Sequence, residues 1–354
     1  MHCAEESRGP HRLSPTRVRR LPRRGVLAAA SGALAAPFLP RFARAAQFTW
    51  RIAHSAPSDF SLQLRLVEAA GTIATHSDGQ MEVQVYPNSE LGGPVGLLAQ
   101  LRAGTIDAVP LTSQLLSSSL AVAALPMLGF AFAGYDRLWP AMDGDVGGFL
   151  RDQIKERLGL VAMDRCWDFG FRQITTGGKT IDTAGDMEGL RLRTVAEADF
   201  IALFQALKAL PVAMPLSALE ATLRSGSIQA QESVLPLVKG AGLFKVQSVC
   251  ALTNHVWDGQ WMCVSAKSWS KLPPKLQQVV AGALNESALN QRQDTMTADT
   301  KIRKELEATG MKFNAVDPES FRATLRKSGY YAAWRTKIGE AGWAALEKYA
   351  GRLT

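Results

Sequence analysis

Alternating strand-like and helix-like segments constrain the fold of this chain more than any other feature. From Phe48 to Val109, three short apolar stretches with strand character alternate with two stretches whose apolar residues recur at helical spacing. The strand-like stretches are 48–52, 81–85 and 106–109, and the helix-like stretches are 62–73 and 97–101. This order, within about 60 residues, predicts a parallel α/β arrangement of strands and covering helices.

The same alternation returns from about residue 160 and predicts a second sheet. Its strand-like stretches are 160–163, 189–195, 212–215, 228–231 and 311–316, with helix-like stretches at 200–207 and 217–224. Residues 273–309 form one helical pattern without strong breakers, so we expect a helix long enough to brace two lobes. The aromatic C-terminal region is also expected to be helical. Two α/β lobes bring strand ends to a shared crevice, where such folds bind ligands.

Residues 1–45 have the pattern of a cleaved export signal. They contain nine arginines and two acidic residues, and therefore carry most of the formal net charge of +8. An arginine pair, Arg23–Arg24, precedes an apolar stretch too short to span a bilayer, and small residues flank Arg44. We predict export to the periplasm with cleavage near Ala45, by the twin-arginine route in preference to the general one. The nearly neutral remainder argues against a nucleic-acid partner.

Motifs of common catalytic sites are absent from the sequence. There is no G-x-S-x-G, P-loop, G-x-G-x-x-G or H-E-x-x-H pattern, and no CxxC pair. We therefore predict no enzyme activity, no cofactor and no metal site, although a metal ion that assists ligand binding is left open. Cys166, Cys250 and Cys263 are expected as buried thiols, with a Cys250–Cys263 disulfide as the alternative.

Two arginines are candidates for binding an anion. Arg193 lies in an otherwise apolar strand pattern, and Arg172 follows the aromatic, glycine-containing stretch 167–171. A guanidinium in a sheet is costly unless it is paired, and its planar fork matches a carboxylate. Each arginine also fits a surface position or an internal ion pair. Arg191 shares the strand face of Arg193, so the alternation does not decide which of the two enters a crevice.

Several segments, in this order and spacing, resemble the solute-binding subunit of tripartite ATP-independent periplasmic (TRAP) transporters of the DctP type. The resemblance covers nearly the whole chain after the leader. The segments are 50–54, 85–92, 100–107, 170–172, 189–193, 211–215, 218–220, 223–226, 231–233 and 255–258. It implies an α/β, two-lobed periplasmic binding protein fold with two sheets, a central ligand cleft and a long helix bracing both lobes.

The resemblance also implies a function and partners. The lobes would close over a small organic acid, with Arg193 holding its carboxylate and Arg172 assisting from the neighbouring strand. The protein, as a monomer, would deliver the acid to a small and a large membrane subunit, and an ion gradient would supply the energy. An exported α/β enzyme acting on a small acid and a ligand-presenting receptor for a sensor kinase are the alternative functions.

Four further residues complete the predicted ligand site. His54 ends the first strand, and Ser233 stands where the family more often has Asn. Trp167 and Trp257 are expected to floor or roof the pocket, with core packing as the alternative. Two indoles and a shortened polar side chain favour an aromatic or otherwise apolar monocarboxylate over a dicarboxylate. We predict a first lobe of 46–170 plus 261–300, and a second of 171–260 plus 301–354.

Overall fold

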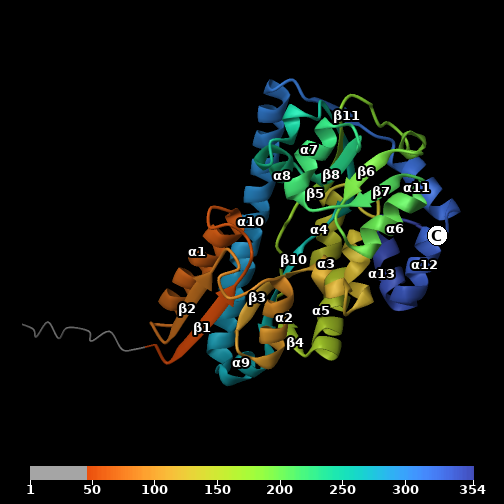
Figure 1. The fold of residues 1–354 in the computed structure, drawn as a ribbon. Helices are drawn as coiled ribbons and strands as arrows, with labels where there is room; N and C mark the ends of the chain where they lie inside the picture. Colours follow the sequence, from red (N-terminus) through yellow and green to blue (C-terminus); the bar gives the residue numbers. More distant parts are fainter. Residues whose placement is uncertain (1–45) are drawn as a thin grey trace, which may run out of the picture. The chain divides into compact units, whose positions relative to one another are not determined.

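Two mixed β-sheets organise residues 46–354, the part of the chain that this computed structural model describes (Figure 1). The first sheet has the strand order β2-β1-β3-β10-β4. Its strands are β1 (Phe48–Ala53), β2 (Met81–Tyr86), β3 (Ala108–Thr112), β4 (Leu160–Ala162) and β10 (Gln260–Ser265). Strands β2, β1 and β3 are parallel, and β10 is antiparallel to both β3 and β4. The predicted α/β class is confirmed, although neither sheet is purely parallel.

The second sheet has the strand order β11-β9-β5-β8-β6-β7. Its strands are β5 (Phe171–Thr176), β6 (Arg191–Thr194), β7 (Leu210–Ala213), β8 (Ala230–Val234), β9 (Val249–Trp257) and β11 (Lys312–Ala315). Strands β7, β6 and β8 are parallel, whereas β5 runs antiparallel to both β8 and β9. The carboxyl ends of β6, β7, β8 and β9 therefore meet the beginning of β5 at one edge of this sheet.

Helices cover both sheets where the apolar spacing predicts them. Helix α1 (Ser61–His76) buries Leu62, Leu66, Ala69 and Ile73, all at helical spacing. Helix α2 (Pro94–Ala103) ends at Gly104, whose φ of 77° suits a residue without a side chain. The remaining helical segments are α3 (Ser113–Ser117), η1 (Ala121–Met127), α4 (Tyr135–Asp143), α5 (Asp145–Leu158), η2 (Ala184–Met187), α6 (Ala198–Ala206), η3 (Leu216–Ala218), α7 (Leu219–Arg224), α8 (Leu235–Gly240), η4 (Leu243–Lys245), α9 (Ala266–Lys271), α10 (Pro274–Ala308), α11 (Pro318–Lys327), α12 (Tyr330–Ile338) and α13 (Glu340–Ala350).

Helix α10 confirms the prediction of a long bracing helix. It has 35 residues, and it packs on α1 beside the first sheet and on α8, which follows β8 of the second sheet (Figure 1). The aromatic C-terminal region is helical, as expected. Helix α11 packs on α6, whereas α12 and α13 pack on η1, α4 and α5. The division into the two predicted lobes is kept as a proposal.

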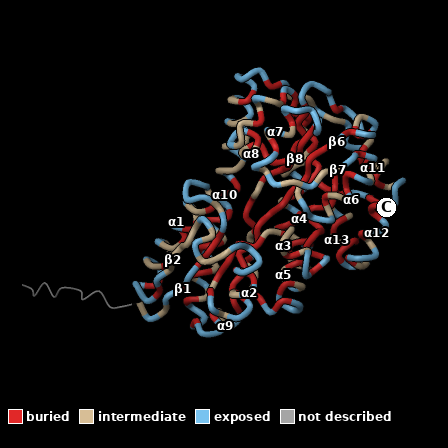
Figure 2. The backbone as a smooth tube through the Cα atoms, viewed as in Figure 1, coloured by how far each residue is buried: buried red, intermediate tan, exposed pale blue. Residues whose placement is uncertain are grey.

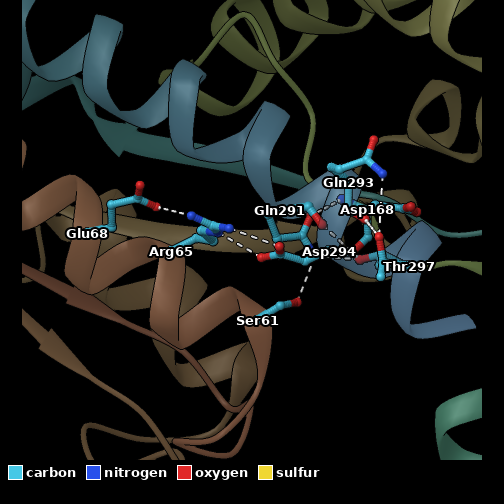
Figure 3. Close-up of polar contacts among 9 residues, drawn as sticks. Ser61, Arg65, Glu68, Asp168, Gln291, Gln293, Asp294 and Thr297 are labelled. Atoms are coloured by element: carbon cyan, nitrogen blue, oxygen red, sulfur yellow. Dashed lines mark hydrogen bonds and ion pairs between the residues drawn. The ribbon is translucent and has the colours of Figure 1, made fainter. Parts of the chain in front are cut away.

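The chain passes between the two sheets three times, at residues 163–170, at residues 258–259 and along α10. Side chains of α10 hold the first of these crossings (Figure 3). The Gln291 amide accepts a hydrogen bond from the Asp168 N–H and donates one to the Asp168 carbonyl, both at 2.8 Å. The Arg65 guanidinium of α1 donates two hydrogen bonds to Asp294 of α10, at 2.7 and 2.9 Å. Helix α10 is thereby tied to both α1 and the crossing.

Buried residues follow the strands of both sheets and the helix faces against them (Figure 2). The three cysteines named above are buried and free, so the alternative of a Cys250–Cys263 disulfide is wrong. Within residues 46–354, no helix is both long and apolar enough to cross a membrane. The predicted export signal and its cleavage site lie outside the described residues.

Candidate functional site

A buried ion pair lies at the edge of the second sheet where β5 begins and β8 ends. The Arg172 guanidinium donates to both carboxylate oxygens of Glu232, with N–O distances of 2.5 and 2.9 Å. Both side chains are buried, and the Thr194 hydroxyl also donates to Glu232 at 2.9 Å. Burial alone would raise the pKa of Glu232, but the charge of Arg172 and a hydrogen bond from His255 lower it to about 2. Arg172 is therefore charge-compensated within the protein.

Strand β8 separates the two candidate arginines. Arg172 is on β5 and Arg193 is on β6, and β8 with Glu232 lies between those strands. The expectation that Arg172 lies on the strand next to Arg193 is wrong, because β8 comes between them. A carboxylate between two guanidinium groups attracts both and reduces their mutual repulsion, which is a physical reason for this order.

Arg193 is a buried cation without an anionic partner. Only 6% of the residue is exposed, and within residues 46–354 no Asp or Glu oxygen lies within 4.0 Å of its guanidinium. Its Nε and Nη2 donate to the Met214 carbonyl at 3.0 and 2.9 Å, which leaves Nη1 without a hydrogen bond to the described residues. Burial lowers the pKa of Arg193. Arg191 is exposed, so the structure distinguishes the two arginines that the sequence pattern could not.

A cavity of about 350 Å³ lies at the carboxyl ends of β1 and β3 in the first sheet. His54 and Gln260 are on its wall, and Phe169 of the first crossing and Leu237 of α8 also line it. The full set of lining residues is His54, Ser55, Ala56, Pro57, Phe60, Leu62, Pro94, Leu97, Val109, Pro110, Leu111, Thr112, Leu115, Phe169, Leu237 and Gln260. The position at strand ends, between two sheets, is the one expected for a ligand of such a fold.

Two residues of the cavity wall are only a few positions along the chain from the edge of the second sheet where β5 begins and β8 ends. Phe169 lies two residues before Phe171, where β5 begins. Leu237 follows Val234 by three residues, and Val234 is the strand partner of Arg172. Three residues span at most about 10 Å, so part of the cavity wall lies within that distance of the edge of the second sheet.

Of the six residues predicted for the ligand site, His54 lines the cavity and the other five do not. Ser233 is buried and donates to the Gln231 side chain at 3.0 Å. Trp257 is buried and donates to Asp168 at 2.8 Å, and Trp167 is fully buried. These side chains thus pack inside the protein, next to the two arginines and to the crossing between the sheets.

The partner of Arg172 and most of the cavity wall were not predicted from the sequence. Every residue of β8 is buried, and a carboxylate in such a strand needs a basic partner, so Glu232 carried a usable signal. The wall residues Pro57, Phe60 and Leu237 gave no comparable signal. Within residues 46–354, no cluster of three or more His, Cys, Asp or Glu side chains is placed to hold a metal ion.

A buried carboxyl group, Asp168, and a half-buried one, Asp299, lie together at the first crossing. Burial raises the pKa of Asp168 even though Trp257 and Gly170 donate to it. Burial and the nearby Asp168 charge raise the pKa of Asp299, on α10, to about 7. Tyr135 of α4 also contacts Asp168. The positive charge of Arg292 opposes part of the rise in the pKa of Asp168. Burial therefore raises the pKa of both carboxyl groups in the folded protein.

We expect Asp299→Asn to stabilise the protein at pH 8 and to flatten its pH dependence. Because the folded pKa exceeds the unfolded value of 3.8, stability is fully retained below about pH 4 and declines as the pH rises to about 7. A shift of this size corresponds to at most about 4 kcal/mol. The side chain is only half-buried, so we expect on the order of 1–2 kcal/mol. Urea unfolding at pH 5, 6.5 and 8 measures the effect.

The exposed Glu286 on the same helix provides the control, as Glu286→Gln. This variant should keep the pH dependence of the parent protein. An unchanged slope in Asp299→Asn as well would show that the carboxyl group at 299 titrates normally.

Comparison with known proteins agrees with this architecture. The model of the bacterial extracellular solute-binding protein family 7, DctP, matches residues 52–332. A solute-binding protein of Roseobacter denitrificans is 27% identical over 80% of this chain and 86% of its own length. The sialic acid-binding periplasmic protein SiaP of Vibrio cholerae is 24% identical over 77% of this chain and 83% of its own.

A solved structure shows the same fold. The TRAP periplasmic solute-binding protein of Ochrobactrum anthropi, crystallised with a C-terminus in its ligand-binding pocket, superposes with a TM-score of 0.81 at 25% identity. The match covers 87% of this chain and 97% of that protein, so it includes both sheets and the long helix. With a family model matched over most of its length, this chain belongs to the DctP family of TRAP solute-binding proteins.

Proposed function

We propose that this chain is a periplasmic receptor that captures a small organic acid and delivers it to the small and large membrane subunits of a TRAP transporter. The observation that carries the proposal is Arg193, a nearly buried guanidinium with no carboxylate partner among the described residues. A buried charge is costly unless it is paired, so the site is built to receive an anion. A carboxylate matches the planar fork of its donors.

The comparisons support a ligand of this class. The family is one of solute-binding receptors, and the relative from Vibrio cholerae is named for binding an acid. In the proposed complex, Arg193 holds the carboxylate, while Arg172 stays paired with Glu232 of β8, the strand between the two arginines. The leader at 1–45 would direct the protein to the periplasm, where it acts as a monomer and not as an enzyme. Closure of the two proposed lobes would retain the acid during delivery.

A thermal-shift panel tests the proposal. Small carboxylic acids are each compared with their primary amides, after the protein has been unfolded and refolded to release any ligand from the host. A ligand at 100 times its dissociation constant adds about 2.7 kcal/mol of stability. We expect at least one acid to raise the melting temperature and its amide to leave it unchanged. If no acid stabilises the refolded protein, the proposal is wrong.

A further inference from the structure

We infer that the acid bound by this receptor has an apolar body and not a polyhydroxylated one. The inference rests on the proposed function and names the ligand class of the same site. The cavity at the carboxyl ends of β1 and β3 is lined chiefly by hydrophobic side chains, most from the first sheet and its neighbouring loops and helices, with Phe169 from the first crossing and Leu237 from α8. Among them are Pro57, Phe60, Leu97, Leu115, Phe169 and Leu237. Hydrophobic walls of this kind stabilise a ligand by removing apolar surface from water.

The polar side chains on the wall are few, and some are already engaged. They are His54, Ser55, Thr112 and Gln260. The Thr112 hydroxyl accepts from the Leu115 N–H at 3.1 Å, and the His54 Nε2 lies 2.7 Å from the Gln63 side-chain oxygen. Ser233, the remaining candidate for contact with the ligand, donates to Gln231 instead. The wall therefore has hydrogen-bond partners for few ligand hydroxyls.

Two of the wall residues each have one buried polar atom without a partner among the described residues, Nδ1 of His54 and Oε1 of Gln260. Burial lowers the pKa of His54, so its ring is neutral. With its proton on Nε2 facing Gln63, the Nδ1 atom is an acceptor, as is the Gln260 oxygen. Two acceptors can receive one or two donors on an otherwise apolar ligand. They cannot satisfy the five hydroxyls of a six-carbon aldonic acid.

The energetic consequence separates the two ligand classes. Each hydroxyl that enters the cavity without a partner weakens binding by roughly 5- to 150-fold. Each methylene that replaces it gains from contact with the leucine, proline and phenylalanine side chains. Arg193 is paired with Gln231 of β8, the strand that leads into α8 and Leu237. A ligand whose carboxylate lies at Arg193 would therefore have to extend past Leu237 and Phe169 to place its body in this cavity.

Hexanoate and gluconate form a matched pair for the test, because each has six carbons and one carboxylate. Phenylacetate and galacturonate add one cyclic acid of each class. Dissociation constants are measured by isothermal titration calorimetry on the purified, refolded protein. We expect the apolar acids to bind at least tenfold more tightly than the sugar acids.

Leu237→Asn tests whether the wall causes this preference. Leu237 is half-buried on the cavity wall, and the exposed Leu210 on β7 is the matched control, as Leu210→Asn. We expect Leu237→Asn to weaken hexanoate binding at least tenfold without weakening gluconate, and Leu210→Asn to change neither. Equal loss of both acids in Leu237→Asn would show that the wall does not set the preference.

The outcomes distinguish the inference from the proposed function. A sugar acid or a dicarboxylate that binds more tightly than both apolar acids overturns the inference and leaves the proposed function intact. Failure of every carboxylate to bind the refolded protein overturns the proposed function itself.

Discussion

Replacing Arg193 with alanine is expected to weaken acid binding by about 2–5 kcal/mol, the range for removing one partner of a buried charge pair. The guanidinium is nearly buried and has no carboxylate among the described residues, so a ligand carboxylate would be its ionic partner. Arg193→Lys should restore little of the affinity, because an ammonium group does not reproduce the planar fork of donors. Isothermal titration calorimetry with the tightest acid of the panel measures both variants.

Arg191 offers a matched control on the same strand. It lies two residues before Arg193, but its side chain is exposed. Arg191→Ala removes the same charge from the protein and should leave the affinity within about twofold. If Arg191→Ala and Arg193→Ala weaken binding equally, the effect comes from general electrostatics and Arg193 does not anchor the ligand.

Glu232→Gln is expected to lower the free energy of unfolding by about 3–5 kcal/mol, because it leaves the buried Arg172 charge without its carboxylate. The glutamine has nearly the same shape, so the loss reports charge and not a cavity. The pKa of Glu232 is about 2, well below the unfolded value of 4.5, so this stabilisation is present above pH 4.5 and declines as the pH falls towards 2. Urea unfolding at pH 7 and at pH 3 measures both effects.

An exposed ion pair of the same type gives the control. Glu220 accepts from Arg224 at 2.7 Å on the surface of α7, and Glu220→Gln should cost less than about 1 kcal/mol. Replacing both buried partners, as Arg172→Met with Glu232→Leu, should recover much of the stability lost in Glu232→Gln. If Glu232→Gln unfolds like the parent protein, then the pair between β5 and β8 is not a major source of stability.

Local sequence patterns were sufficient to predict most strands and the long helix. Strands β1, β2 and β6 and helix α10 each carry their periodicity within one continuous segment of the chain. The pattern for residues 135–158 is weaker, because Pro140 lies inside α4 and α5 contains Gly147. Gly147 is required because a side chain there would collide with the Met142 carbonyl. The glycine at position 147 therefore reflects close packing inside α5, although a glycine in a sequence is more typical of a loop.

The candidate site depends on contacts between distant segments, which local patterns do not contain. Arg172 and Glu232 are 60 residues apart, and the local pattern around Arg172 did not show that this arginine, predicted to assist Arg193, has a carboxylate of its own. The structure pairs Arg172 internally and leaves Arg193 without an anion among the described residues. The cavity likewise combines residues from the beginning of the chain, such as His54, with Leu237 and Gln260. The crossings between the two sheets decide which side chains share the wall of this cavity.

A crystal structure with the tightest acid of the panel tests the central claim most directly. We expect a ligand carboxylate oxygen about 2.7–2.9 Å from an Arg193 nitrogen, the range of a charge-assisted hydrogen bond, with Arg172 still paired to Glu232. An acid whose carboxylate binds elsewhere, while Arg193 contacts only the Met214 carbonyl as it does here, would contradict the assignment of Arg193 as the anchor.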